Sequence, residues 1–173
     1  LCDIPDDPPH PWRRNEWMSN DEAEIKARAP LAQRSYYAAV TDMDRNIGRL
    51  LDHIDKTGRL ENTIIIYTSD HGCTLGHHGF WGKGNGTRPF NMYENSVKVP
   101  LIFSQPGRLP QGRVCDALTN GYDFAPTLLD YLGLPGIGGE GLPGRSFVPA
   151  LLGDGDGGHE SIVAYNLRSI LCV

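Results

Sequence analysis

The chain has 173 residues, the size of one ordinary domain, and 39% of them are hydrophobic, which is enough for a core and argues against wholesale disorder. Sixteen basic and 21 acidic residues give a formal net charge of −5, so the sequence lacks the basic clusters that nucleic-acid binding requires. No apolar run approaches the roughly 20 residues that span a bilayer, so we expect no membrane span.

Four cysteines are widely separated and form no C-x-x-C pair, which excludes a zinc ribbon and a thioredoxin-type redox motif. They are Cys2, Cys73, Cys115 and Cys172, and the sequence leaves their disulfide pairing open. The chain begins with Leu1, and no basic-then-apolar leader, the mark of a signal peptide, follows it. We therefore expect a processed or truncated piece of a longer protein, and its compartment stays open.

The first periodic segment follows an extended Pro- and Trp-containing stretch over residues 1–18. Apolar residues recur at three- and four-residue steps from Val40 to Ile54, which predicts one stripe of an amphipathic helix. The tyrosines at and after Tyr36 extend this helix backward, and Gly58 is predicted to end it.

Two short apolar segments predict buried strands. Residues 63–68 are β-branched and apolar on both faces, as in buried parallel strands, and residues 99–103 have the same character. The glycine-rich stretch between them, residues 72–95, is predicted as one long loop.

The last part of the chain is predicted to alternate a helix, loops and strands. Asp123 is expected to cap a helix that ends at Gly133, and a Gly/Pro loop follows over residues 133–145. The remaining predicted elements are a helical turn over residues 146–152 and strands over residues 161–165 and 169–171. The order helix, strand, loop, strand, helix predicts an α/β fold with a mostly parallel sheet flanked by helices.

Ionisable side chains gather behind the first predicted strand. Asp70 and His71 stand at its carboxyl end, where open α/β sheets bind ligands. An oxygen donor beside an imidazole suits half of a divalent metal site. With His77, His78 and Lys83 on the glycine-rich stretch, the cluster suits an anionic substrate held by metal and ammonium. A surface loop with incidental histidines and a turn-capping Asp is the alternative reading.

The stretch from Tyr67 to Gly84, with its SDHG and LGHHGFWGKG segments, closely resembles the sulfatase family of the alkaline-phosphatase superfamily. The resemblance extends in the right order over residues 36–153. Four flanking segments agree with the family's patterns: residues 37–54 with "MD..IG", 93–102 with "YE.S.RVPLI", 123–129 with "D..PTLL", and 144–147 with "G.SL".

The resemblance implies an alkaline-phosphatase-like fold that is incomplete, because the amino-terminal half of the catalytic domain is absent. It implies that residues 1–158 are the carboxy-terminal portion of that domain and that residues 159–173 begin a small C-terminal antiparallel subdomain. The resemblance is compatible with an extracytoplasmic, periplasmic or lysosomal setting, and the sequence leaves the compartment unknown.

The resemblance carries roles to individual residues. Asp70 and His71 match the ligands of a divalent cation, usually calcium. Lys83 matches the lysine that binds the sulfate ester, where an ammonium neutralises developing charge. His78 matches a position that is often His in related sequences and is grouped with the substrate-binding residues, whereas His77 stands where many relatives have Glu and receives no role.

The nucleophile of the family is not found in this sequence. Sulfatases use a cysteine or serine within C/S-x-P-x-R, oxidised to formylglycine, and none of Cys2, Cys73 and Cys115 fits that pattern. We therefore expect the nucleophile, and the second acidic pair of the metal site, upstream of this chain. The chain by itself is expected to be inactive.

The leading hypothesis is hydrolysis of sulfate esters by the longer protein. A phosphodiesterase, phosphonate hydrolase or phosphotransferase of the same superfamily stays open, because manganese and zinc favour an imidazole such as His71. A non-catalytic anion-binding fragment is the third possibility. The sulfate ester itself cannot be identified: Trp12, Trp17 and Trp81 could stack on a sugar ring, but buried packing is the expected use of each.

Overall fold

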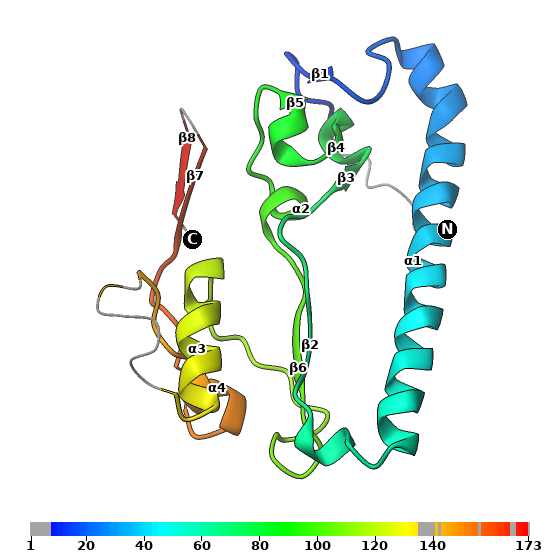
Figure 1. Cartoon of the computed structure of the whole chain (residues 1–173). Helices are drawn as coiled ribbons and strands as arrows, with labels where there is room; N and C mark the ends of the chain where they lie inside the picture. The colour runs from blue at the N-terminus through cyan, green and yellow to red at the C-terminus, as the bar shows by residue number, and fades with distance from the viewer. Residues whose placement is uncertain (1–7, 135–140, 142, 156, 167–168, 173) are drawn as a thin grey trace. The chain divides into compact units, whose positions relative to one another are not determined.

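The computed structural model describes residues 8–134, 141, 143–155, 157–166 and 169–172. The chain forms two compact units (Figure 1). Unit 1 comprises Leu1–Thr57 and Thr68–Pro100, and unit 2 comprises Gly58–Tyr67 and Leu101–Val173. All the candidate metal-ligating and substrate-binding residues belong to unit 1.

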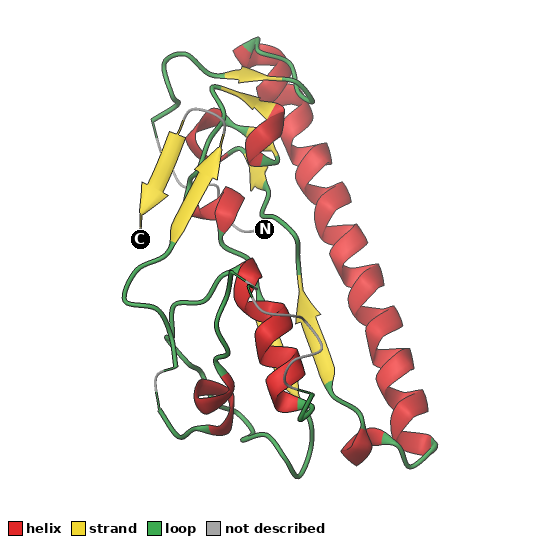
Figure 2. Ribbon diagram, turned by 60° about the vertical axis from the view of Figure 1, so that its left-hand side comes forward, coloured by secondary structure: helices red, strands yellow, loops and turns green. Residues whose placement is uncertain are grey.

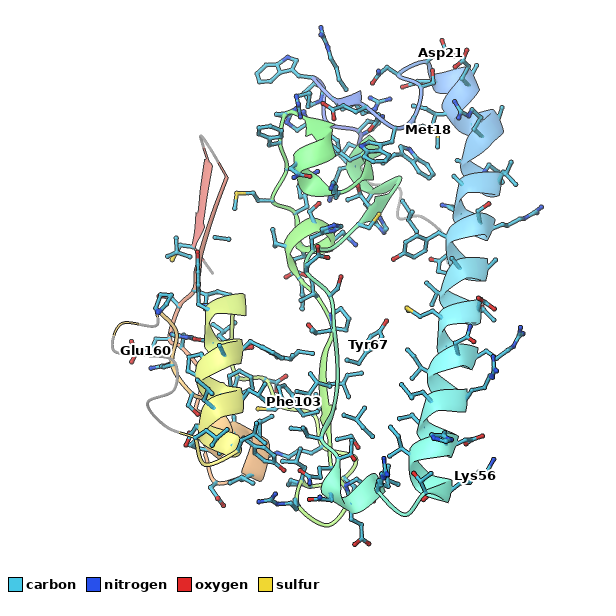
Figure 3. The ribbon with its side chains drawn as sticks, in the orientation of Figure 1. Met18, Asp21, Lys56, Tyr67, Phe103 and Glu160 are labelled. Atoms are coloured by element: carbon cyan, nitrogen blue, oxygen red, sulfur yellow. The ribbon has the colours of Figure 1, made fainter. Side chains whose placement is uncertain are left out.

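The longest element of unit 1 is helix α1, Glu22–Lys56. Its N-terminus is capped by Asp21, whose carboxylate accepts a hydrogen bond from the backbone N–H of Glu24 at 3.0 Å. Lys56 lies in the last turn, where a positive charge complements the helix dipole, and Gly58 follows with a φ of +66°. Figure 3 labels Asp21 and Lys56 at the two ends of this helix.

The predicted end of this helix is confirmed, whereas its predicted start is wrong. The helix begins at Glu22 rather than near Tyr36, and it includes Pro30. The added segment is rich in Ala, Glu, Lys and Arg, which have high helix propensity but form no apolar stripe, so the periodicity analysis could not detect it. No side chain of α1 is buried in this chain.

The glycine-rich stretch of unit 1, predicted as one long loop, contains several short elements instead (Figure 2). Strand β3 (Thr74–Leu75) pairs antiparallel with β4 (Trp81–Gly82), and β1 (Arg14–Asn15) pairs antiparallel with β5 (Thr87–Arg88). The other elements are the 3-10 turns His77–Gly79 and Gly84–Gly86 and the helix α2, Glu94–Val97.

The core of unit 1 is built around Phe80 and Trp81, which are buried, and around the buried amide of Asn15. The Asn15 Oδ1 accepts a hydrogen bond from the Trp81 backbone N–H at 3.0 Å, and its Nδ2 donates to the Gly79 carbonyl at 3.2 Å. The amide therefore ties the amino-terminal segment to the β3–β4 hairpin and satisfies two backbone groups that would otherwise be buried without partners.

Unit 2 contains the remaining predicted helices and strands with small shifts of their bounds. The two strands that were predicted as buried are not buried in this chain: residues 65–68 are intermediate to exposed, and Ile102 of the second strand is 56% exposed. Strand β2 (Ile65–Thr68), most of which lies in unit 2, pairs with β6 (Leu101–Ser104). The other elements are the 3-10 turns Leu60–Asn62 and Gly121–Asp123, the helices α3 (Phe124–Tyr131) and α4 (Val148–Leu152), and the antiparallel strands β7 (Val163–Asn166) and β8 (Ser169–Cys172). Much of the predicted loop over residues 133–145 lies outside the described residues.

The predicted mostly parallel sheet is not confirmed. Within the described residues the strands form two-stranded pairs, and the three pairs with a defined register are antiparallel. For β2 and β6, Gln105 Nε2 donates to the Glu61 carbonyl at 2.8 Å, which places the end of β6 beside the start of β2, as in an antiparallel pair. The predicted domain boundary after residue 158 stays a prediction. Among the described residues no helix has both the length and the apolar character that a membrane crossing requires.

Three aromatic rings form the apolar centre of unit 2. Phe103 of β6 lies 5.8 Å from Phe147 in an edge-on arrangement and 6.4 Å from Phe124, the first residue of α3. Figure 3 shows the labelled Phe103 on the strand pair. Thr127, fully buried on α3, accepts a hydrogen bond from the Phe147 backbone N–H at 3.1 Å, so a polar contact fixes the same junction.

Asp123 does not cap α3 as predicted, because its side chain makes no cap bond to that helix. Its carboxylate instead accepts from the Asn120 backbone N–H at 2.8 Å, the Arg145 backbone N–H at 2.9 Å and the His159 imidazole at 2.9 Å. Burial by itself would raise the pKa of Asp123, but these three donors outweigh it and hold the pKa below its ordinary value. A buried carboxylate therefore joins three separate segments of unit 2.

Replacing Asn15 by Ala should destabilise unit 1 by roughly 2–4 kcal/mol, because the Trp81 N–H and the Gly79 carbonyl lose their partner in a buried place. Chemical denaturation followed by tryptophan fluorescence measures this change. Asn15→Asp keeps the acceptor and loses the donor, so its free energy of unfolding should fall between those of the unmodified chain and Asn15→Ala. Asn46→Ala, on the exposed surface of α1, is the control, and an equal loss in both alanine variants would contradict the assignment.

Acid should weaken unit 2 through Asp123. Because the folded-state pKa lies below the unfolded value of about 3.9, the carboxylate stabilises the fold above that pH and this contribution is lost as the pH falls through the folded pKa. Asp123→Asn should lower the melting temperature at pH 7 and should show a smaller further drop between pH 5 and pH 3 than the unmodified chain. Circular dichroism melts measure both, with the exposed Asp116→Asn as the control; parallel curves for D123N and the unmodified chain would refute the role of this group.

Candidate functional site

The first part of the site is the pair Asp70 and His71, directly after β2. The His71 Nε2 lies 3.7 Å from the Asp70 Oδ1, and both side chains reach solvent. The His71 Nδ1 lies 2.9 Å from the Gly72 carbonyl oxygen, which can only accept, so in the neutral ring Nδ1 carries the proton. The Nε2 then keeps its lone pair. A histidine whose Nδ1–H is held by a backbone carbonyl can ligate a metal through Nε2.

Gly72 allows the next segment to approach the backbone closely. Its N–H donates to the Ser96 carbonyl at 3.0 Å, and a Cβ added at Gly72 would lie 2.1 Å from the Asn95 carbonyl oxygen. A side chain at this position would therefore force the two backbones apart. The contact anchors the Asp70–His71 segment to α2.

The second part of the site is Lys83, which the β3–β4 hairpin returns toward this pair. The register pairs Thr74 with Gly82 and Leu75 with Trp81, so the chain reaches Lys83 one residue beyond the Thr74–Gly82 pair. The hydroxyl of Thr74 also donates to the Gly82 carbonyl at 2.8 Å. In the described part of the chain the Lys83 ammonium has no ion-pair partner.

Ser96 contacts both parts of the site. Its carbonyl accepts from Gly72, and a Cβ added at Gly84, next to Lys83, would lie 3.1 Å from the Ser96 Cβ. The Ser96 hydroxyl donates to the Asn91 side chain, which in turn donates to the Thr87 hydroxyl at 2.8 Å. The buried chain of Ser96, Asn91 and Thr87 thus holds the Asp70–His71 segment and the Lys83 turn against one common element.

The two histidines of the hairpin turn differ in their surroundings. His78 has a φ of +52° and stacks on Tyr93, with the ring centroids 3.9 Å apart and the planes inclined by 17°. The His77 Nδ1 is buried without a hydrogen-bond partner among the described residues. The predicted grouping of His78 with the substrate-binding residues is not tested by this geometry, which gives the ring a packing partner in Tyr93.

Cys73 stands between the Asp70–His71 pair and the β3–β4 hairpin. Burial raises the pKa of its thiol, and a hydrogen bond with the Gly82 backbone offsets this only in part. Cys73, Cys115 and Cys172 are free thiols, whereas Cys2 lies outside the described residues.

Buried packing, the expected use of three tryptophans, holds only for Trp81, which is 4% exposed. Trp12 is 80% exposed and Trp17 is 67% exposed. The expectation of buried packing is therefore wrong for Trp12 and Trp17 in this chain.

A set of three His, Cys, Asp or Glu side chains arranged around a common point is not found among the described residues. The Asp70 Oδ1 and the His71 Nε2 lie 3.7 Å apart, which is close enough for both atoms to contact one ion. The sequence predicts roles for this pair and for Lys83, and these roles stay predictions. It does not single out Ser96, Asn91 and Thr87, because in the sequence they are ordinary polar residues in or beside the glycine-rich stretch.

The sulfatase family pattern matches residues 8–134 of the chain. An N-acetylglucosamine-6-O-sulfatase of Bacteroides thetaiotaomicron is 41% identical over 122 residues, which cover 70% of this chain and 20% of that protein. The chain therefore spans about a fifth of the length of this curated relative.

Solved structures agree with this similarity. One, a complex with its substrate D-glucosamine-2-N,6-O-disulfate, is similar with a TM-score of 0.73 and 34% identity, over 87% of this chain and 30% of that chain. The phosphonate monoester hydrolase of Agrobacterium radiobacter is similar with a TM-score of 0.63 and 31% identity, over 74% of this chain and 24% of that one. Through the match to its pattern over residues 8–134, the chain belongs to the sulfatase family.

Proposed function

We propose that this chain contributes metal-ligating and substrate-binding residues to a sulfuric ester hydrolase whose nucleophile lies outside residues 1–173. The reaction consumes water, breaks a sulfate ester and releases an alcohol and sulfate. One observation supports this most directly. In this chain, which matches the sulfatase family pattern, Ser96 contacts both the Asp70–His71 segment and the turn that contains Lys83. By resemblance, the nucleophile is a formylglycine formed within C/S-x-P-x-R.

Asp70 and His71 fit a divalent cation by their donor chemistry. A carboxylate oxygen and an imidazole nitrogen with its lone pair free lie 3.7 Å apart, and the Gly72 carbonyl fixes the tautomer. A divalent cation bound there would supply Lewis-acid polarisation of the sulfate oxygens. We propose calcium by resemblance, with manganese or zinc if the phosphodiesterase alternative holds.

Lys83 is proposed to bind the sulfate group of the substrate. Its ammonium lacks an ion-pair partner within the described residues, and the hairpin register holds its backbone close to the Asp70–His71 segment. A compact positive charge stabilises the negative charge that develops on the leaving oxygen. His78 is proposed as a second substrate-binding group, with its ring orientation set by Tyr93.

A phosphonate or phosphodiester hydrolase is the second candidate. The similarity to a phosphonate monoester hydrolase at 31% identity supports it, as does the imidazole of His71 in the metal-binding pair. Rates of the longer protein on an aryl sulfate and on the matching aryl phosphonate separate the two, because the sulfatase proposal requires the sulfate ester to react faster.

The finer features of the fold belong to the same proposal. In the longer protein, we expect β2 and β6 to belong to a larger, mostly parallel sheet, with residues 1–158 in the catalytic domain. The β7–β8 hairpin is expected to begin a C-terminal antiparallel subdomain from residue 159.

Asp70→Ala should weaken calcium binding by about tenfold or more, because the metal loses a carboxylate ligand. Isothermal titration of the 173-residue chain with calcium, and separately with manganese and zinc, measures the effect and ranks the metals. Asp42→Ala is the matched control, since Asp42 is an exposed carboxylate on α1, 3.9 Å from Arg45. Equal affinities of both variants and the unmodified chain would exclude Asp70 as a ligand.

Lys83→Ala should lower kcat/KM of the longer protein on a sulfate ester by about 100-fold or more, the effect of removing one preorganised electrostatic donor. Lys83→Arg should recover only part of the loss, because a planar fork does not replace a compact charge. Lys98→Ala controls for loss of a surface lysine, since Lys98 is exposed and lies 3.8 Å from Glu94. Unchanged kinetics in the Lys83→Ala variant would show that Lys83 is a solvated surface lysine with no role in the reaction.

A further inference from the structure

Trp17 is an exposed aromatic side chain held directly beside the Lys83 turn. A Cβ added at Gly82 would lie 3.5 Å from the Trp17 Cδ1, and one added at Gly86 would lie 2.6 Å from the Trp17 Nε1. Gly82 and Gly86 flank Lys83 in the sequence, so the indole packs against the backbone on both sides of this lysine. The indole nevertheless remains 67% exposed.

The position of Trp17 is fixed by its neighbours. Strand β1 pairs Asn15 with Thr87, and the next residue, Glu16, forms an ion pair with Arg88 at 2.7 Å. Trp17 therefore follows directly from a segment that is hydrogen-bonded to the other end of the same turn. Such a side chain is preorganised, so it loses little conformational entropy when a ligand packs on it.

Tryptophan is enriched at interfaces, because its indole offers a large apolar face together with one polar N–H group. Because positions 82 and 86 are glycines, the Trp17 indole can pack against the backbone both before and after Lys83. A ligand whose anionic group meets the Lys83 ammonium would place the rest of its structure near this indole. The rest of a sulfate ester is the esterified alcohol.

We propose that Trp17 is a specificity-determining residue that stacks on the ring of a sulfated sugar whose sulfate group is bound by Lys83. This inference rests on the proposed function, because it takes the sulfate-binding role of Lys83 as given. The C–H face of a pyranose ring matches the apolar face of an indole, whereas an acyclic alcohol gains little from it. Trp17 then selects among sulfate esters without touching the reacting atoms.

The test is a titration of the 173-residue chain, in the presence of calcium, followed by NMR of its amide and indole N–H signals. The three ligands are N-acetylglucosamine 6-sulfate, unsulfated N-acetylglucosamine and inorganic sulfate. The sulfated sugar should shift the Trp17 indole signal and the Lys83 amide together, and inorganic sulfate should shift the Lys83 amide alone.

Trp17→Ala should weaken binding of the sulfated sugar by about five- to tenfold, the size of one stacking contact, and should leave binding of inorganic sulfate unchanged. Trp12→Ala is the matched control, because Trp12 is even more exposed and does not contact the glycines beside Lys83. If Trp17→Ala misfolds, Trp17→Phe and Trp17→Leu replace it. Both keep apolar packing on the turn, and only Phe should retain the affinity.

The outcomes separate this inference from the proposed function. A response of the Lys83 amide to sulfate, combined with equal affinities of the Trp17 variants for the sulfated sugar, would overturn the role of Trp17 and leave the proposed function standing. Absence of any response to both sulfate and the sulfated sugar would overturn the role of Lys83, and the stacking role with it.

Discussion

The arrangement of unit 1 depends on one buried side-chain amide. Asn15 donates to one backbone group and accepts from another in a hairpin more than sixty residues away in sequence. Backbone groups buried beside Phe80 and Trp81 have no water to bond with, so the amino-terminal segment must stay in place for the hairpin to be satisfied. The same hairpin sets the position of Lys83, and the same amino-terminal segment delivers Trp17.

The catalytic chemistry proposed for the longer protein depends on where unit 1 places its ionisable side chains. The Asp70–His71 pair and Lys83 come from two ends of a hairpin, and Ser96 contacts the backbone next to each. Neutral hydrogen bonds and close backbone contacts hold the segments that carry these charges, and Asp70 and Lys83 form no ion pair with each other in the described part of the chain. Such a framework keeps the ammonium available for an anionic ligand and avoids a competing internal partner.

Local patterns explain which features the sequence could predict. The apolar stripe from Val40 to Ile54, the β-branched run of β2 and the apolar run of β6 all carry periodic or compositional signals, and all appear in the structure. The Asp70–His71 pair was found for the same reason, since it follows a recognisable strand. Strands of two residues such as β1 and β5 are too short to show an alternating pattern. Their pairing is set by contacts between segments that are far apart in the sequence.

The polar network of Ser96, Asn91 and Thr87 was beyond sequence reasoning on similar grounds. Its members are ordinary loop residues, and only the close backbone approach at Gly72 and Gly84 turns them into a buried unit. The exposure of Trp17 could not be predicted either. An indole in a Pro-rich segment is expected to pack inward, and its actual place depends on the β1–β5 pairing.

The raised pKa of the Cys73 thiol gives this hairpin a built-in reporter. Reagents that alkylate cysteine attack the thiolate, so the exposed Cys115 and Cys172 should react before Cys73, which is only partly exposed. The order in which the three thiols are modified therefore reports whether the backbone that carries Cys73 and pairs with Gly82 stays folded.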